Sequence, residues 1–498
     1  MYGYVQNPAA FVFSILMDQR EFAMKMQRLL FLAPVFLLAS CAINPVSGER
    51  ELALISESQE IQIGREVAAQ AEQQFGLVDD AELQAYVHRL GMRLAKASER
   101  PELPWAFKVV DDPTPNAFAA PGGFIFVTRG LLALMRNEAE LVSVLGHEIG
   151  HVTARHSVAM MSRSQLAQLG LGIGSLLSPE IAQFGDLAAG GLQLLFLSYS
   201  RDAERQADDL GYRYALEQDY DVREMVNVFA ALEQSATLAG QSPVPNWLAT
   251  HPYAGERIAR INTQLATLPP ATPPRRIGED DFLTRIDGLV YGVNPRDGYF
   301  EANRFIHPEL AFRVDFPQGW RMQNLTQAVV AASPREDALM QLMLVPGPLN
   351  KAAEAFFTQQ GLTAGRVGSQ EVNGLPAIVG AFEAQTQQAR LGGVATFVSL
   401  EGRTYRILAY TPVQRQGTYD RTFRTSMSTF ARLTDPKALA RQPQRLAIVR
   451  VPRSTTLAQF NQAYPSAIPM EELALINHLE GPQAVMPAGF RAKRIVGK

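Results

Sequence analysis

Cysteine is almost absent from this sequence: the 498 residues contain one, Cys41, so no disulfide can form within the chain. The fold must therefore be stabilised by an apolar core or by a metal. Hydrophobic residues make up 47% of the sequence and charged residues 19%, which is typical of a large soluble protein.

An excess of either charge is also lacking. Lysine and arginine together number 46 and aspartate and glutamate 49, giving a net charge of -3. No basic patch is present, so nucleic acid is not an expected partner.

Long apolar runs and internal repeats are missing as well. The apolar run from 29 to 39 is too short to cross about 30 Å of hydrocarbon. Residues 164–178 and 187–199 carry no charge but are short and, in the first case, broken by glycine; we expect core and a lid there rather than membrane spans. A repeat of about 34 residues, which would indicate a helical-repeat tail, is not found.

Residues 1–40 are predicted to be a targeting region. A short basic segment precedes the apolar run, and Leu38-Ala39-Ser40-Cys41 then resembles a bacterial lipobox. The true start is predicted at Met24 or Met26, because the residues before them are charged in a way that such signals are not. Lipidation of Cys41 would anchor the mature chain to a membrane without spanning it. By resemblance to lipoprotein sorting, Ala42 favours the outer membrane.

The motif with the clearest chemistry is His147-Glu148-Ile149-Gly150-His151. Apolar residues around it recur with a helical period, so the motif is expected on a buried helix. Residues four apart share a helix face, which places the two imidazoles side by side, where they can hold one Zn²⁺. Glu148 then flanks the open position of the metal and can accept a proton from water.

A catalytic zinc site needs a third protein ligand. Ala154 and Ser157 stand where a metzincin has glycine and histidine, which excludes that class. His156 lies nine residues from His147, about 180° around one continuous helix, and is therefore predicted to point away from the metal.

The next acid-rich helix, predicted over 198–211, supplies better candidates. Glu204 and Asp208 are four residues apart and share a face with Ala207 and Gly211, small residues that permit close helix packing. Glu204 can complete a His-His-Glu site. Asp208 can accept the second ring N–H of one metal histidine and so fix its tautomer.

These motifs, together with Thr250-His251-Pro252, Asn116-Ala117-Phe118-Ala119 and the run 121–131, resemble the zinc proteases related to the CAAX prenyl endopeptidases, most of all their soluble bacterial BepA-like branch. The resemblance covers residues 44 to about 262. It implies one Zn²⁺ per chain, with His147, His151 and Glu204 as ligands, Glu148 as catalytic base and His251 as a candidate fourth ligand.

His251 precedes Pro252, which disfavours helix at the residue before it, so a loop position is expected. A loop imidazole at the fourth position would displace the attacking water. His251 is therefore a candidate latch that keeps the enzyme inactive; the alternative is that it packs or caps the following helix.

The chain is predicted to be α+β, with a mainly helical zincin-type protease domain that contains a small sheet. Domains are expected at 41–265 (protease), 281–434 (α+β, of unknown role) and 446–497, with a proline-rich linker at 266–280. The last unit resembles a LysM module, a strand-helix-helix-strand peptidoglycan binder.

Strands are expected at 105–110, 124–128, 312–316, 339–345, 377–382, 394–400 and 405–411, and a helix near 350–360. A strand beside the metal helix is expected to pair with an extended substrate.

The predicted function is a zinc endopeptidase, lipid-anchored in the bacterial periplasm at the outer membrane, that acts in quality control of envelope or outer-membrane proteins. Its expected partners are protein substrates, the membrane through the lipid, peptidoglycan and the outer-membrane assembly machinery. The alternative is a non-catalytic lipoprotein chaperone or scaffold that binds cell wall and envelope clients. Retention of Glu148 favours the enzyme.

Overall fold

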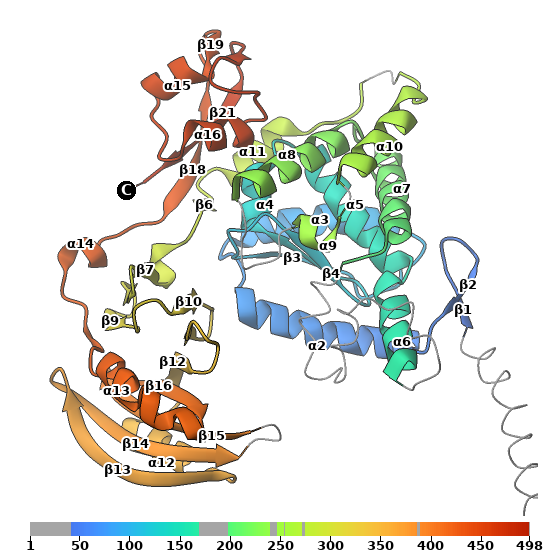
Figure 1. Ribbon diagram of the computed structural model, residues 1–498. Helices are drawn as coiled ribbons and strands as arrows, with labels where there is room; N and C mark the ends of the chain where they lie inside the picture. The colour runs from blue at the N-terminus through green and yellow to red at the C-terminus, as the bar shows by residue number, and fades with distance from the viewer. Residues whose placement is uncertain are drawn as a thin grey trace, which may run out of the picture.

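The computed structural model describes residues 41–168, 198–239, 247–252, 254–270, 274–385 and 389–497. The predicted targeting region and most of the predicted lid lie outside these ranges. A helical N-terminal part, a β-rich middle part and a small C-terminal unit follow one another along the chain (Figure 1). The predicted α+β class is confirmed. Within the described ranges, no helix combines the length and apolar character that crossing a bilayer requires.

Several helices of the N-terminal part begin at polar caps. The Ser56 hydroxyl accepts the backbone N–H of Gln59 in a capping box, and the side chains of Asn137 and Ser200 each accept one backbone N–H at the start of two later helices. The helices of this part are α2 (Glu57–Phe75), α3 (Ala81–Lys96), α4 (Arg129–Leu134), α5 (Glu138–Thr153), α6 (His156–Gln168), α7 (Arg201–Glu217), α8 (Glu224–Ala239), α9 (Trp247–Thr250), α10 (Ala254–Ala266) and α11 (Glu279–Ile286).

A small sheet accompanies the helices, with the order β3–β5–β4. Strand β5 (Phe124–Thr128) is parallel to β3 (Ala106–Val110) and antiparallel to β4 (Ala117–Ala120). The predicted strand at 124–128 is confirmed, and that at 105–110 is confirmed except for its first residue. A separate two-stranded hairpin, β1 (Cys41–Ile43) and β2 (Arg50–Leu52), precedes α2.

The middle part contains two antiparallel sheets. The larger has the order β10–β11–β12–β16–β15–β14–β13 and the smaller the order β17–β9–β8–β7. Their strands are β7 (Tyr299–Glu301), β8 (Arg304–His307), β9 (Phe312–Asp315), β10 (Arg321–Asn324), β11 (Val329–Ala332), β12 (Leu339–Val345), β13 (Leu362–Val372), β14 (Leu375–Gln385), β15 (Arg390–Leu400), β16 (Arg403–Pro412) and β17 (Ala431–Arg432). The strands predicted here are all confirmed, some as parts of longer strands.

Helices cover both faces of the larger sheet. Helix α13 (Gln416–Met427) contributes Phe423 to a core shared with the smaller sheet, whereas α12 (Leu349–Phe357) packs Phe356 on the opposite face. The helix predicted near 350–360 is thus confirmed, and α13 was not predicted, since its apolar residues are few. Short 3₁₀ turns occur at η4 (Pro295–Asp297) and η5 (Val413–Arg415), and α14 (Pro436–Leu439) leads to the last unit.

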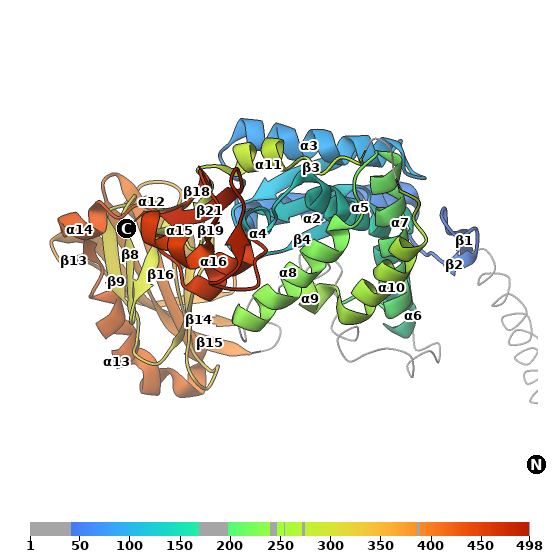
Figure 2. The same cartoon turned by 90° about the horizontal axis from the view of Figure 1, so that it is seen from above.

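The C-terminal unit shares one hydrophobic core with the N-terminal part, although the middle part separates them in sequence. It consists of β18 (Gln444–Arg450), β19 (Thr455–Thr456), α15 (Leu457–Ala463), α16 (Met470–Ile476), β20 (Val485–Met486) and β21 (Arg491–Val496). Strand β18 pairs with β21 and with β6 (Val290–Tyr291), which follows α11. Figure 2 shows this unit beside α4, α8 and α11. Residues 279–291 therefore pack with the first core, before the β-rich part begins.

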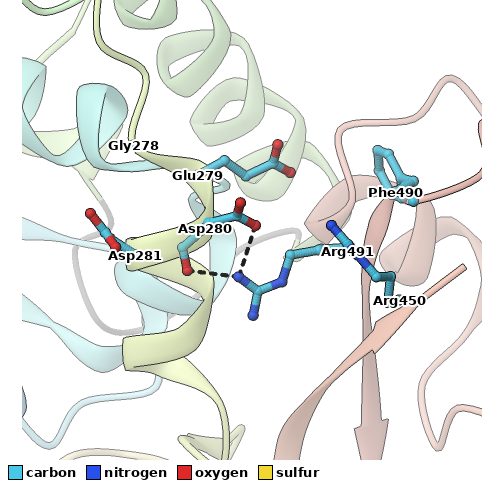
Figure 3. Close-up of a pocket in the computed structure, with 8 residues that line it drawn as sticks. Gly278, Glu279, Asp280, Asp281, Arg450, Phe490 and Arg491 are labelled. Carbon is cyan, nitrogen blue, oxygen red and sulfur yellow. Dashed lines mark hydrogen bonds and ion pairs between the residues drawn. The ribbon is translucent and has the colours of Figure 1, made fainter.

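Polar contacts join the C-terminal unit to the end of α4. The buried Lys493 Nζ donates to the carbonyl oxygens of Ala133 and Leu134, 2.8 and 3.2 Å away, and to that of Met135. Burial lowers the pKa of Lys493, while three carbonyl acceptors at the end of α4 favour the ammonium form, which alone offers three N–H donors. On the outer side, Arg491 contacts the carbonyl and carboxylate of Asp280 beside a cleft of about 420 Å³ (Figure 3).

Candidate metal centre

Helix α5 carries the His-Glu-x-x-His motif through the middle of the N-terminal part. All of its residues are buried, so its side chains meet protein on every face. The Asn137 side chain caps its first turn by accepting the N–H of Glu140 at 2.9 Å. The helix stops at Ala154, and Arg155 takes a left-handed conformation with φ 58° before α6 begins.

Four buried side chains converge near the end of α5. His147, His151, Glu204 and His251 each offer one ligand atom, and these atoms lie within 4.8 Å of one another. The two Nε2 atoms of His147 and His151 are 3.0 Å apart, and His251 Nδ1 is 3.1 Å from Glu204 Oε1. The four side chains come from α5, from α7 and from the residue that follows α9.

Glu148 lies on the edge of this group. Its Oε1 atom is 3.4 Å from His251 Nε2, is buried, and has no hydrogen-bond partner among the described residues. A buried carboxylate oxygen without a partner is costly unless a cation or water meets it. Three imidazoles and two carboxylates that face one point form the nitrogen and oxygen donor set that Zn²⁺ takes in proteins, so the residues fit this ion.

Hydrogen bonds on the far side of His147 determine its tautomer. Asp208 Oδ1 is 2.9 Å from His147 Nδ1, so this nitrogen donates and Nε2 keeps its lone pair for the cluster. Arg257, on α10, holds Asp208 from behind with contacts of 2.6 and 2.8 Å. Its Nη1 atom also lies 3.0 Å from Glu204 Oε2, at ion-pair distance but out of hydrogen-bond alignment.

His156 occupies a place that the sequence did not predict. Its Nε2 lies 2.8 Å from Gln206 Oε1 and its Nδ1 lies 2.8 Å from His151 Nδ1. If His156 donates to Gln206, its Nδ1 must accept from His151, which leaves His151 Nε2 with a lone pair. His156 is not among the residues that offer a ligand atom, but its contact with His151 was not predicted, because the prediction assumed one continuous helix and the chain bends at Arg155.

Burial and neighbouring charges shift the pKa values of the side chains in and beside the cluster. Burial lowers the pKa of His151 well below its usual 6.5, and charge on neighbouring histidines lowers it further. Burial alone would raise the pKa of Glu204, but His251 and Arg257 outweigh it, so the pKa lies below its usual value. Burial would likewise raise the pKa of Asp208, which Arg257 and His147 hold well below its ordinary range. At neutral pH the site thus offers a neutral imidazole and ionised carboxylates.

Two aromatic side chains complete the walls of the site. The ring of Tyr199 stacks on His151 with a centroid distance of 3.9 Å, and its hydroxyl is 2.9 Å from Ser157 Oγ. Trp247 stacks on His251 at 4.8 Å. Sequence reasoning missed both residues, and also Arg257. Two acids on one buried helix face do predict a basic partner, but not which arginine supplies it.

Glycines allow α5 and α7 to approach closely enough to form the site. A Cβ atom on Gly150 would lie 3.0 Å from the Cα atom of Ala207, and one on Gly211 would lie 2.8 Å from the backbone nitrogen of His147. Both spacings are shorter than ordinary contacts. The close packing between these helices, which the small residues on α7 predict, is present.

The strand arrangement corrects one expectation. Strand β5, at 124–128, lies between β3 and β4 and is not exposed for pairing. The sheet edge on the α5 side is β4, since α5 packs against it. A period-2 pattern cannot show which strand of a sheet is the edge, because pairing order is a tertiary property.

The C-terminal unit has the order strand, helix, helix, strand in β18, α15, α16 and β21. Its relation to LysM modules stays a prediction.

Three features together are typical of a zincin-type metallopeptidase domain. They are the His-Glu-x-x-His motif on α5, a carboxylate from a second helix and a small mixed sheet, and this part of the chain has all three. Residues 81–265 match the model of peptidase family M48. This part of the chain is thus similar to the family M48 peptidases, and the chain resembles the beta-barrel assembly-enhancing proteases.

Three relatives illustrate the extent of the similarity. The putative beta-barrel assembly-enhancing protease of Vibrio cholerae is 32% identical over 203 residues, which are 39% of this chain and 41% of the relative. The beta-barrel assembly-enhancing protease of Escherichia coli K12 is 28% identical over 68% of this chain and 66% of the relative. The mitochondrial metalloendopeptidase OMA1 of Schizosaccharomyces pombe is 30% identical over 36% of this chain and 52% of the relative. The chain spans only about half the length of the first curated relatives that it matches.

Proposed function

We propose that this chain is a zinc-dependent endopeptidase that cleaves proteins of the bacterial envelope. The observation that carries the proposal is the buried group of His147, His151 and Glu204, with the Glu148 Oε1 atom beside it that has no hydrogen-bond partner among the described residues. The names of the relatives, which include proteases that enhance β-barrel assembly, support the envelope as the place of action.

His147, His151 and Glu204 would hold the zinc ion. Bound there, zinc would supply a Lewis acid that lowers the pKa of water and polarises the carbonyl of the substrate. Asp208 and His156 would keep both metal histidines in the tautomer that presents Nε2.

Glu148 would act as the base and then as the acid. Its free Oε1 atom, enclosed by protein, takes the proton of the attacking water and returns it to the amine that leaves. An extended substrate would reach the edge of β4, whose residues are buried, only if the segments that cover this strand moved aside.

His251 is proposed as a latch on this machinery. It follows α9, and its backbone N–H donates to the carbonyl of Trp247 at 2.8 Å. Its ring nitrogens lie 3.1 Å from Glu204 and 3.4 Å from Glu148, in the space that an attacking water would need. Movement of this segment would open the site.

The deciding experiment is Glu148→Gln in the purified chain. Since Glu148 is proposed as base and not as ligand, zinc content should stay near one per chain while casein hydrolysis falls at least about 10²-fold. Near-normal turnover, with zinc retained, would refute the assignment.

Attachment through lipid on Cys41 is a further part of the proposal. Two or three acyl chains would hold the protein stably at the outer membrane, where envelope substrates and peptidoglycan are in reach. Cys41→Ser should leave an unprocessed precursor with altered membrane fractionation, and the full chain should co-sediment with purified peptidoglycan. Unchanged processing of Cys41→Ser would refute lipid attachment at Cys41. A chain that does not co-sediment would refute the binding to peptidoglycan.

A further inference from the structure

A large cavity lies between the metallopeptidase domain and the β-rich middle part, at the end of α2 and the beginning of α4. Its volume is about 990 Å³. Leu77 and Arg129 line it from the metallopeptidase side, and β7, β8, β9, β10 and β12 line it from the other. Ligand-binding cavities occur preferentially at such domain boundaries and have volumes of this order.

Aromatic rings form one side of the cavity. Phe300, Phe305, His307, Phe312 and Tyr405, here called the aromatic wall, all line it. Neighbouring rings within the wall have centroid distances of 5.0 to 6.2 Å. Burial lowers the pKa of His307 to about 4, so this ring is uncharged at neutral pH. Phe305, Phe312 and Tyr405 are buried behind the surface, so the apolar side chains that a bound molecule could contact are the half-buried Phe300 and the exposed Leu77, Val293 and Leu344.

A buried polar atom at this wall has no partner. Tyr405 is 1% exposed, and among the described residues nothing hydrogen-bonds its hydroxyl. A buried tyrosine hydroxyl normally finds a partner, and leaving it without one costs free energy. Its oxygen is covered by protein, so a molecule in the cavity would contact this hydroxyl only if the neighbouring side chains moved.

Two sheet edges border the same cavity. Strand β7 ends the smaller sheet and β10 ends the larger one, and residues of both strands line the cavity. The side chain of Asn324 on β10 joins them by donating to the carbonyls of Asp297 and Gly298, at 2.9 and 3.1 Å. An edge strand presents unpaired backbone groups, which an extended polypeptide can pair with.

The charge at the rim favours a polypeptide with a basic residue. Asp297 lies exposed at the rim, and no lysine or arginine of the described chain is at ion-pair distance from it. Asp111, also at the rim, is paired with Arg129. Arg441, the other arginine that lines the cavity, is paired with Glu301 at 3.2 Å. A fatty acid or phospholipid would therefore bring negative charge to a rim whose described arginines are already paired, whereas a lysine or arginine would bring positive charge to Asp297.

We propose that this cavity is a second binding site, which takes an extended polypeptide segment with a bulky apolar side chain next to a basic residue. The inference rests on the proposed function, because such a segment would belong to an unfolded protein substrate. Backbone groups would pair with β7 or β10, the apolar side chain would pack on Phe300 and the exposed apolar residues of the cavity, and the basic residue would meet Asp297.

The test uses a fluorescein-labelled peptide in which phenylalanine and lysine alternate with serine, and a second peptide with serine in place of phenylalanine. Fluorescence anisotropy measures their binding to the full chain carrying Glu148→Gln, so that nothing is cleaved. Leu344→Asp places a charge in the cavity, and Val367→Asp is its control, because both residues lie in the larger sheet with exposed fractions of 43% and 41%.

The phenylalanine peptide should bind more tightly than the serine peptide, and Leu344→Asp should weaken its binding about tenfold. Val367→Asp should change it less than about twofold, a limit typical of residues outside an interface.

Three results would overturn the proposal: equal binding of the two peptides, equal effects of Leu344→Asp and Val367→Asp, or binding of a fluorescent fatty acid where the peptide does not bind. The last would identify a lipid site. Anisotropy requires no catalysis, so a chain that binds the peptide here but hydrolyses no protein would refute the proposed function and leave this site standing.

Discussion

His156 and Asp208 act on the metal centre without offering a ligand atom to it. Each contacts the Nδ1 atom of one metal histidine, at 2.8 and 2.9 Å, so that both Nε2 lone pairs point to the same place. Such partners orient a ligand ring and increase its basicity. The pairing of His151 with another histidine also requires His156 to stay neutral, since a protonated His156 could not accept.

The contribution of His156 can be measured directly. His156→Ala removes the acceptor for His151 Nδ1, and zinc affinity should fall about 10- to 100-fold. Competition with a chromophoric zinc chelator gives the affinity. His88→Ala, an exposed histidine on α3, is the matched control and should leave it unchanged. Equal affinities for the two variants would show that His156 only packs.

The proposed latch at His251 can be tested by removing its side chain. If the latch closes the site in nine-tenths of the molecules, its removal opens these molecules too, and basal activity rises about tenfold, near 1.4 kcal/mol in the opening equilibrium. His251→Ala should therefore cleave casein faster than the unmodified chain and retain zinc. A variant that loses zinc or turns over more slowly would make His251 a required ligand or donor instead.

At the scale of elements, the contact between α5 and α7 decides whether a site forms. Glu204 comes from α7 and the histidines from α5, so the distance between the helix axes sets the distance between their ligand atoms. Gly146, Gly150 and Gly211 bring the two backbones together, and the atoms that a Cβ would meet are mostly backbone atoms that cannot turn aside.

Gly211→Ala should push the two helices apart, because the new methyl group would lie 2.8 Å from the backbone nitrogen of His147. We expect a loss of about 1–3 kcal/mol in the free energy of unfolding, together with weaker zinc binding. Gly255→Ala on α10 is the control, since no atom lies within 4 Å of the added methyl group. It should be neutral or stabilise by up to about 1 kcal/mol. Chemical denaturation of both variants checks this, and equal stabilities would refute the close-contact argument.

At the scale of the whole molecule, the C-terminal unit is attached to the helix that carries the metal motif. His478 Nε2 lies 3.2 Å from the carbonyl of Leu134 and His478 Nδ1 lies 3.3 Å from Glu140 Oε1, in the first turn of α5. Burial lowers the pKa of His478 to about 3, so its ring is neutral and Nδ1 accepts. A protonated Glu140 can donate to it, and burial does raise the pKa of Glu140 to about 8.

This junction makes stability depend on pH. The folded chain keeps a proton on Glu140 between its usual pKa of 4.5 and about 8, whereas the unfolded chain has lost it, so the contribution of Glu140 to stability decreases as pH rises through that window. His478, with its lowered pKa, contributes the opposite slope between about pH 3 and 6.5. The slope from Glu140 is at most about 1.4 kcal/mol per pH unit. Glu140→Gln should remove it, so the variant gains stability relative to the unmodified chain from pH 5 to pH 8.

Denaturant unfolding at several pH values measures the difference, with Glu480→Gln, an exposed residue of the C-terminal unit, as control for the loss of one carboxylate. A stability difference between Glu140→Gln and the unmodified chain that does not change with pH would contradict the raised pKa.

Local patterns were sufficient for much of the site. The four-residue spacing of His147 and His151 places them on one helix face whatever surrounds the helix, and the same holds for Glu204 and Asp208. Strand β5 begins and ends where its run of β-branched and aromatic residues does. These features depend on neighbours in sequence, and so a reader of the sequence alone can find them.

Other features depend on which distant segments meet. The chain bend at Arg155 turned His156 toward His151, and no helical period could show it, because a single residue with positive φ redirects everything after it. The buried Arg257, the edge position of β4 and the cavity between the parts arise from the packing of separate elements. Spacing along the chain therefore determined the chemistry of the motif. Which distant residues contact the motif, and what surrounds it, was decided by the tertiary structure, because the sequence offers many similar candidates for each contact.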